Sequence, residues 1–320
     1  MLKELKFVSG AVAKKDLLPA MTHFCIEGGH VRSYNGTLAL SSPIAFNLDC
    51  KPKATDLVKA INNCNETITL SMTDTGRLRI QSGSFKAFIE CVQGDTPHVM
   101  PEGEEIHFDG EQLLKAVTTL ERFVGSDASR PWSNGILLRG QSAFATNNVC
   151  LVEYWTGFQF PLVVNIPLLA VREMLRINEA PTHGQVTENS ITFHYEDGRW
   201  IRTQLYNTEW PDLAKVLDAP CKAEPLSDII FEGAESLKPF ADKMGRVYLE
   251  GETMRTHLDP NEGASFSLEG HVPYDLEGIY QIEMLKLLKG VATSIDFSLF
   301  PSPAIFYGDR LRGAIVGMKL

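Results

Sequence analysis

Histidine, cysteine and carboxylate side chains could carry catalysis or bind a metal, but their spacing here builds neither kind of site. The eight histidines never fall three or four residues apart, and the six cysteines are scattered without a Cys-x-x-Cys pair, so the spacing of a zinc site is missing. Adjacent acids such as Glu104 and Glu105 are typical of a solvated loop in an acidic chain. The sequence predicts no catalytic residue, no metal site and no cofactor.

Motifs that bind nucleotides or activate nucleophiles are also missing from the sequence. It contains no GxGxxG, no GxxxxGK[ST], no HExxH and no GxSxG. Two alternative functions stay open on this basis. One is a hydrolase with an inter-domain cleft built from carboxylates such as Glu209 and Asp212, which predicts a deep polar cleft and a monomer. The other is a non-ring scaffold that binds protein peptides.

The overall charge gives no first sign of a nucleic-acid partner. The 320 residues include 30 Lys and Arg against 40 Asp and Glu, a formal net charge of −10, whereas DNA-binding proteins usually present a basic surface. Residues 1–7 lack the apolar run of a signal peptide, and no stretch approaches the roughly 20 apolar residues that span a bilayer. We therefore expect a cytoplasmic protein with no membrane partner.

An internal repeat organises the whole chain. Each copy predicts a short strand, an amphipathic helix and then two or three alternating strands, with a period of about 50 residues. The six copies span 5–42, 45–92, 105–154, 162–205, 228–269 and 274–318. Their opening strands are expected at 5–8, 45–48, 105–108, 162–166, 228–232 and 274–278. Their helices are expected at 14–23, 54–63, 110–124, 167–177, 234–243 and 281–290. Among the later strands, single strands are expected at 25–31 and 143–154.

Two segments with linker-like composition divide the repeat into pairs of copies. Residues 94–103 and 218–225 are rich in Pro, Gly and Asp, which favour turns and loops. The fold class is therefore α+β with three similar domains of two repeats each, at 1–100, 101–220 and 221–320. Domains of about 100 residues are of normal size.

Every expected helix carries cations at its polar positions. These are Lys14, Lys15, Lys51, Lys53, Lys59, Lys115, Arg122, Arg172, Arg176, Lys238, Lys243, Lys286 and Lys289. One lysine on a helix is usually a solvated charge, but agreement among six helices in an acidic chain predicts segregation. We expect a basic surface made by helices and an acidic exterior made by strands and loops, although acids such as Asp56 and Glu121 dilute the pattern.

Several segments carry a family resemblance. They are ATNNVCLV at 145–152, VVNIP at 163–167, IRTQLYNTEWPD at 201–212 with KVL at 215–217, PAIFY at 303–307 and AIVGMKL at 314–320. They resemble the bacterial DNA sliding clamp, the β subunit of DNA polymerase III, and the sixfold repeat extends the resemblance to the whole chain. The chain is shorter than is usual for that family, as a divergent phage-encoded version would be.

The resemblance implies a DNA clamp fold assembled into a closed ring, with helices lining the hole and strands outside. Such a ring encircles double-stranded DNA without reading its sequence and tethers the replicative DNA polymerase as a processivity factor; the clamp loader is a further partner. Helices packed about 10 Å apart put six in a circle with a hole of only about 9 Å, and twelve around a hole of about 28 Å. Because the major groove alone is about 12 Å wide, two chains head to tail form the smallest sensible ring.

The resemblance also implies one apolar pocket that receives a short peptide from partner proteins. Its residues, matched position by position, would be Arg130, Trp132, Ser133, Thr146, Asn148, Val149, Leu151, Pro211, Lys215, Val216, Pro303, Ala314, Val316 and Met318. The sequence departs from the family at three points. It has Asn147-Asn148 where Asp-Gly is common, Ser133 where a small aliphatic residue is common, and Val-Gly-Met at 316–318 where Met-Pro-Met is common.

Two further expectations concern DNA and ring closure. The loop 126–132 resembles one that touches DNA at the edge of the ring, so Arg130 could serve DNA or the pocket. The DNA-facing residues would thus be Arg130 and the helix cations named above, apart from Lys51. The edge strand 85–92 would pair with the third domain of the other subunit, with Phe88 and Ile89 supplying apolar contact.

Overall fold

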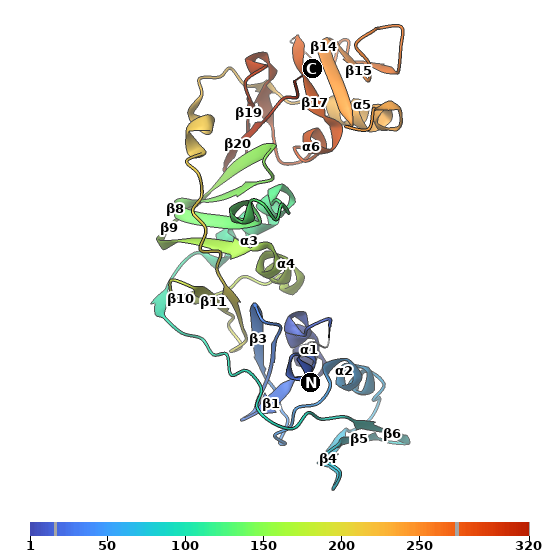
Figure 1. Ribbon diagram of the computed structural model, residues 1–320, viewed down its shortest axis with the longest axis vertical. Helices are drawn as coiled ribbons and strands as arrows, with labels where there is room; N and C mark the ends of the chain where they lie inside the picture. The colour runs from blue at the N-terminus through green and yellow to red at the C-terminus, as the bar shows by residue number, and fades with distance from the viewer. Residues whose placement is uncertain (16–17, 273–274, 320) are drawn as a thin grey trace. The chain divides into compact units, whose positions relative to one another are not determined.

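The computed structural model describes residues 1–15, 18–272 and 275–319 of the chain (Figure 1). These form two compact units. Unit 1 comprises Met1–Leu114 and Leu169–Leu205, and unit 2 comprises Lys115–Leu168 and Tyr206–Leu320. Among the described residues, no helix has both the length and the apolar character needed to cross a membrane.

Six α-helices are present in the described residues. They are α1 Leu2–Val8, α2 Ala54–Asn62, α3 Gly110–Leu120, α4 Leu168–Ile177, α5 Ile229–Leu237 and α6 Ile282–Lys286. The helices α2, α3 and α4 confirm the predicted ranges to within a few residues. Each buries one stripe of apolar residues; in α2 the stripe includes Leu57, Ala60 and Ile61, which lie three or four residues apart.

Unit 1 contains two antiparallel sheets. The seven-stranded sheet has the order β1 Cys25–Glu27, β2 His30–Tyr34, β3 Leu38–Pro43, β12 Trp200–Gln204, β11 Ser190–His194, β10 His183–Val186 and β7 Glu104–Ile106. The three-stranded sheet has the order β4 Thr69–Met72, β5 Leu78–Ser82 and β6 Phe85–Ile89. In the larger sheet, β3 and β12 join the first and fourth copies of the repeat, with Leu40 opposite Ile201.

Unit 2 also contains two antiparallel sheets. The six-stranded sheet has the order β13 Glu224–Pro225, β18 Ser294–Asp296, β19 Ala304–Gly308, β20 Leu311–Ile315, β9 Cys150–Pro167 and β8 Gly135–Thr146. The four-stranded sheet has the order β16 Ser265–Ser267, β15 Thr253–Arg255, β14 Arg246–Gly251 and β17 Leu276–Gln281. Here β9 and β20 join the third and sixth copies, with Leu151 opposite Ala314.

The start of the chain corrects the first copy of the repeat. Residues 5–8 belong to α1 rather than to a strand, because Leu5 and Val8 lie one helical turn apart and are fully buried. No α-helix occupies the described part of 14–23, where only a short 3₁₀ turn at Pro19–Thr22 forms. The expected helix also runs through residues 16–17, which lie outside the described part of the chain. Lys14 and Lys15 are therefore exposed residues of a non-helical segment.

The second and fifth copies also depart from the pattern at their opening strands. Residues 45–48 form a connection without strand pairing. Residues 228–232 begin helix α5 instead of a strand, and the helix predicted at 234–243 ends early, in a 3₁₀ turn at Lys238–Phe240. Proline at position 239 lacks the N–H that a continuing α-helix would need.

Two predicted strands are split by turns. The strand expected at 25–31 breaks at Gly28 and Gly29, which both have positive φ and make the turn between β1 and β2. The strand expected at 143–154 breaks at residues 147–149, so β8 and β9 form a hairpin. The strand expected at 162–166 is the end of β9. The strand expected at 274–278 begins outside the described residues, and β17 starts at Leu276.

The two compact units do not match the three predicted domains, because both joining strand pairs connect different predicted domains. Strand β3 belongs to the predicted first domain and β12 to the second, whereas β9 belongs to the second and β20 to the third. The division at 1–100, 101–220 and 221–320 stays a prediction based on the repeat.

Candidate partner-binding pocket

The hairpin turn between β8 and β9 forms one side of a pocket in unit 2. Asn148 adopts φ 71°, a left-handed conformation that Asn tolerates better than most residues. The Asn147 side chain accepts hydrogen bonds from the backbone N–H groups of Val149 and Cys150, at 3.1 and 2.7 Å. The Asn-Asn sequence thus builds a tight turn with its own side-chain hydrogen bonds, in place of the Asp-Gly that is common in the clamp family.

The pocket encloses about 250 Å³ and is lined mainly by apolar side chains. Its lining residues are Arg130, Trp132, Thr146, Asn148, Val149, Cys150, Leu151, Pro211, Leu213, Val216, Pro303, Ala314 and Val316. Eleven of the fourteen residues predicted for the pocket are among them. Segments separated by more than 150 residues in the sequence therefore converge on one cavity.

Three of the predicted residues lie outside the lining. Ser133 is fully buried, and its hydroxyl donates to the carbonyl of Arg130 at 2.9 Å, so it fixes the loop behind the cavity. Lys215 is exposed and pairs with Asp212 at 2.9 Å. Met318 donates its backbone N–H to the carbonyl of Ile279 at 2.7 Å, which ties down the chain near its end.

An apolar cluster forms the floor of the pocket. Leu151, Leu217, Ile305 and Ala314 are buried together, and Leu151 and Ala314 are opposite each other on β9 and β20 of the six-stranded sheet. At the rim, Val316 keeps 44% of its surface exposed. Removing such exposed apolar surface from water would favour binding of an apolar side chain, at roughly 25 cal/mol per Å².

Two tryptophan side chains contact each other at the pocket. The rings of Trp132 and Trp210 meet edge to face with centroids 5.4 Å apart. Trp210 also packs against the apolar floor, and its indole N–H is buried without a hydrogen-bond partner. Sequence reasoning quoted Trp210 in a family motif but missed its place beside the cavity; it also missed Cys150 and Leu213.

An arginine on β20 binds the segment that contributes Leu217 to the floor. The Arg312 guanidinium donates to the Glu153 carboxylate at 2.7 Å, to Asp218 at 2.9 Å and to the carbonyl of Leu217 at 3.3 Å. Leu217 is thereby held in the floor cluster, while Val216 lines the cavity. This ion-pair network positions the pocket wall and was not foreseen from the sequence.

Ionisable side chains are few among the residues that line this pocket. Burial raises the pKa of the Cys150 thiol to about 12, so the thiol stays protonated and is a poor nucleophile. Arg130 is the one ionisable side chain other than Cys150 among the lining residues, and it is exposed. Asp212, a candidate in the alternative hydrolase, is exposed and pairs with Lys215 instead of facing a cleft.

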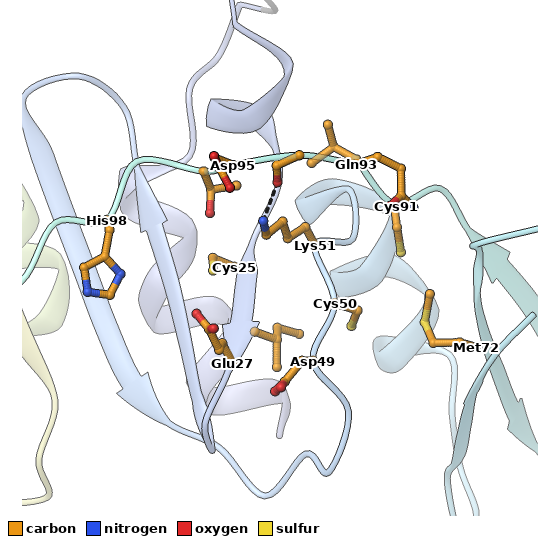
Figure 2. Close-up of a pocket in the computed structure, with 14 residues that line it drawn as sticks. Cys25, Glu27, Asp49, Cys50, Lys51, Met72, Cys91, Gln93, Asp95 and His98 are labelled. Carbon is orange, nitrogen blue, oxygen red and sulfur yellow. Dashed lines mark hydrogen bonds between the residues drawn. The ribbon is translucent and has the colours of Figure 1, made fainter.

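Unit 1 contains a larger cavity of about 690 Å³, lined by Cys25, Cys50, Cys91 and Met72 with several polar residues (Figure 2). Burial raises the pKa of the Cys50 thiol to about 12 and also raises that of Cys91. Lys51 reaches across to the carbonyl of Gly94, the dashed contact in Figure 2. Among the described residues no three His, Cys, Asp or Glu side chains could hold a metal ion, so this cavity has no evident chemistry.

The predicted DNA-facing cations lie in three kinds of place. Lys59, Lys115, Arg172, Arg176 and Lys286 lie on α-helices. Lys53 is the N-cap of α2, and Arg122 and Lys238 lie in 3₁₀ turns that follow α3 and α5. The remaining residues, Lys14, Lys15, Arg130, Lys243 and Lys289, lie outside helices. The helix α1 carries two exposed lysines, Lys3 and Lys6, which are not among the predicted DNA-facing cations.

Several of these cations are engaged within the protein. Lys238 pairs with Glu283 at 2.9 Å, and Lys286 pairs with Glu235. Arg176 contacts Glu173 and donates to the last carbonyls of α1, including that of Phe7. Arg122 donates to the carbonyl of Lys289 at 3.2 Å. The expectation of a basic surface made by helices stays a prediction, and these ion pairs show acids beside some of its cations.

The predicted contact strand β6 lies at an edge of the three-stranded sheet. Phe88 on this strand is 49% exposed, with the Lys86 ammonium 5.1 Å from its ring centre. Ile89 is 5% exposed and packs inside unit 1, so its side chain is not available to a second chain. Phe88 is the apolar contact that this strand can offer.

Comparison with known proteins places this arrangement in a known fold. A DnaN sliding clamp (DNA polymerase III subunit β) from Bartonella birtlesii, bound to griselimycin, matches with a TM-score of 0.85 and 16% identity over 100% of this chain and 97% of the clamp. The DNA polymerase sliding clamp of Bacillus subtilis matches with a TM-score of 0.83 and 13% identity over the same shares. Caulobacter crescentus pol III β matches with 0.85 and 17%, again over 100% and 97%. No family model and no curated protein matches the sequence. The chain therefore has the DNA clamp fold, at an identity that establishes the fold alone.

Proposed function

We propose that this chain is a sliding clamp: two copies close head to tail around double-stranded DNA and tether the replicative DNA polymerase as a processivity factor. The observation that carries the proposal is the regular way in which copies of the repeat are joined. The first copy joins the fourth through their last strands, β3 and β12, and the third joins the sixth through theirs, β9 and β20. Both joints are antiparallel.

The second and fifth copies have no such joint within the described residues. Their last strands, β6 and β16, are both edges of their sheets. A second copy of the chain can supply both missing joints, since β6 of each chain would pair with β16 of the other and close a ring with two-fold symmetry. Twelve helices then surround a hole that is wide enough for a duplex.

Exposed apolar side chains in the second and fifth copies support this closure. Phe88 of the second copy is 49% exposed, and Phe240 and Met244 of the fifth copy are 64% and 56% exposed. Lys86 on β6 and the exposed acid Glu269 beside β16 are opposite in sign, although the exposed acid Glu90 directly follows β6. Apolar and charge complementarity are what a specific interface needs.

The pocket in unit 2 would receive a short apolar peptide from the polymerase, the clamp loader or other partners. Its volume, its apolar floor and its exposed rim valines suit such a ligand. The adjacent Arg130 could engage an acidic residue of the peptide or the DNA phosphates. Eleven of the fourteen residues that the family resemblance predicted line the pocket, together with Cys150 and Leu213.

DNA would be held by topology rather than by tight contacts. A closed ring cannot leave a circular duplex without opening, so exposed cations such as Lys59 and Lys115 need only face phosphates through water. Such a protein needs no chemistry of its own, and we assign it no enzymatic activity. We place it in the cytoplasm, where its DNA and polymerase are found.

The first test is the size of the particle and the identity of its edges. The proposal requires a stable species of twice 35.5 kDa at micromolar concentration. It also requires that Ala87→Cys on β6 forms an intermolecular disulfide with one of Ser265→Cys, Phe266→Cys or Ser267→Cys on β16. Thr253→Cys, on the interior strand β15, is the matched control and should not cross-link. A monomer, or cross-linking at Thr253→Cys as efficient as on β16, would contradict the ring.

A further inference from the structure

A second exposed site lies on the same strands as the pocket. Along β9, Leu151, Glu153 and Trp155 share one face of the sheet, because successive side chains of a strand point to opposite faces. On the neighbouring β20, Arg312 lies opposite Glu153. Leu151 lines the pocket, whereas Trp155 lines a separate open cavity of about 400 Å³ together with Tyr307 and Arg310. We call the Trp155–Arg310 pair the platform.

The chain holds the platform in a fixed geometry. Trp155 is 51% exposed, and the Arg310 guanidinium lies 4.5 Å from its ring centre. The same guanidinium donates to the carbonyls of Trp155 and Thr156, at 3.0 and 3.3 Å. Gly157 has φ +80°, and a Cβ there would lie 2.7 Å from the Arg310 side chain. A rigid aromatic surface of this kind loses little entropy when it binds a ligand.

The charge of the platform is not balanced by an ion pair. Among the described residues, Arg310 contacts no carboxylate within 4.0 Å, whereas Arg312 pairs with both Glu153 and Asp218. The neighbouring acid Asp309 is exposed at the turn between β19 and β20. An exposed indole beside an unpaired guanidinium suits an aromatic side chain with a carboxylate next to it.

We infer that the platform is a second anchor point for the partner peptide that occupies the pocket. The occupant is the continuation of that peptide, carrying an aromatic residue flanked by acidic residues. Leu151 and Trp155 are four residues apart on one strand, which is about 13 Å, so roughly four extended residues bridge the two sites. The inference rests on the proposed peptide pocket and adds a specificity that the pocket alone does not have.

Linking two weak anchors raises affinity because the second contact becomes intramolecular. Fluorescent peptides with a Leu-Leu-Phe anchor, a four-residue Gly-Ser spacer and an Asp-Phe-Asp end, made in both chain directions, are the probes. One direction should bind at least about tenfold more tightly than the anchor alone. The Lys-Phe-Lys version should gain nothing, because Arg310 repels it.

Variants of the platform decide whether this gain comes from the named residues. Trp155→Ala and Arg310→Ala should each return the acidic probe to the affinity of the anchor alone, and Arg310→Glu should favour the lysine probe. Leu258→Ala and Arg77→Glu, at exposed positions elsewhere, are the matched controls and should change nothing. If the Leu-Leu-Phe anchor binds but the Asp-Phe-Asp end adds no affinity, the inference is overturned while the proposal of a peptide pocket stands.

A second readout keeps the platform testable if the anchor itself fails to bind, which would count against the pocket. The indole NMR signal of Trp155, identified with Trp155→Phe, should shift with free Asp-Phe-Asp peptide and not with Lys-Phe-Lys. No shift, or a shift at lower concentration with oligo-dT, would overturn the inference. The oligo-dT result would instead assign the platform to base stacking of single-stranded DNA.

Discussion

The two joints between copies of the repeat have the same antiparallel strand pairing but differ in the cavities beside them. In unit 1, Arg202 on β12 holds a crossing segment through the carbonyl of Met100, at 2.5 Å, and through the Glu102 carboxylate. In unit 2, Arg312 on β20 holds a crossing segment through the carbonyl of Leu217 and the Asp218 carboxylate. In each unit, an arginine on one of the two joined strands therefore binds the segment that crosses the joint.

The two joints differ in the volume of the adjacent cavity and in the side chains that surround it. Beside the unit 1 joint, the cavity next to Ala39 and Val99 holds only about 20 Å³, whereas the unit 2 pocket holds about 250 Å³. Apolar Leu151 lies opposite Ala314 at the unit 2 joint, where the unit 1 joint has Ala39 opposite Arg202. The same strand pairing thus occurs twice, and the side chains at each joint decide whether a sizeable apolar pocket forms beside it.

Blocking the pocket should have the largest effect. Val316→Asp places a charge at the apolar rim and should weaken binding of the Leu-Leu-Phe anchor by at least about 30-fold, the size expected for a central interface residue. Because Val316 is 44% exposed, the free energy of unfolding should change little. Val163→Asp, at an exposed position on β9, is the control for fluorescence anisotropy. Equal binding by both variants would remove the pocket from the account.

Removing the arginine at each joint should affect peptide binding at the unit 2 joint only. Arg312→Ala should weaken the anchor by about tenfold, because Val216 and Leu217 lose their support, and should lower the free energy of unfolding by about 1 kcal/mol after solvent screening. Arg202→Ala should cost similar stability and leave anchor binding within about twofold. Urea unfolding and anisotropy measure the two quantities. A binding loss in Arg202→Ala would show that the joints are not independent.

Acid should act on unit 1 through a histidine pair. His183 and His194 lie opposite each other on β10 and β11, with parallel rings 4.5 Å apart. Burial, and then the charge of His183, lower the pKa of His194, although nearby Glu105 opposes the shift. A lowered histidine pKa means that the unfolded chain binds the proton more readily. The stability is therefore complete above the unfolded pKa of about 6.5 and falls as pH drops from there toward the folded pKa.

Replacing the half-buried His194 should flatten this dependence. Urea midpoints at pH 7.5 and 5.5 should differ less for His194→Gln than for the wild-type protein, with exposed His271→Gln as the control. The difference should be smaller than that caused by Arg312→Ala. An unchanged pH dependence in His194→Gln would exclude the pair as its source.

The smallest effects are expected from the helix lysines of the two units. Lys59 on α2 of unit 1 forms no ion pair among the described residues, whereas Lys238 and Lys286 of unit 2 pair with Glu283 and Glu235. Lys59→Gln should reduce the salt dependence of DNA retention by up to about one unit of slope. Lys238→Gln should change it less. A larger change from Lys238→Gln would mean that its ion pair opens on DNA.

The sequence predicts helices α2, α3 and α4 best, and the opening strands of the first, second and fifth copies worst. Helices α2 and α4 follow from apolar residues at helical spacing, and α4 starts directly after a proline. The first copy was misread because Leu5 and Val8 fit a short strand as well as a helix, and the fifth because the turn at Pro239 was not recognised. Short elements carry too few residues for periodicity to decide between helix and strand.

The candidate site was foreseen only where residue identity matched a family motif. Leu213 and Cys150 line the pocket, but neither had been singled out. The network of Arg312 could not be predicted, because Glu153 lies 159 residues away in the sequence and meets it only through strand pairing. The exposure of Trp155 likewise depends on which face of β9 points outward.

Ring closure around DNA is the central claim, and a covalent trap tests it most directly. The Ala87→Cys chain with its β16 cysteine partner would be oxidised in the presence of relaxed circular plasmid, and then washed in 1 M salt. The account predicts that protein stays with the circle and is released when a restriction enzyme cuts the plasmid. Release by salt alone, or retention after the cut, would contradict a topological link.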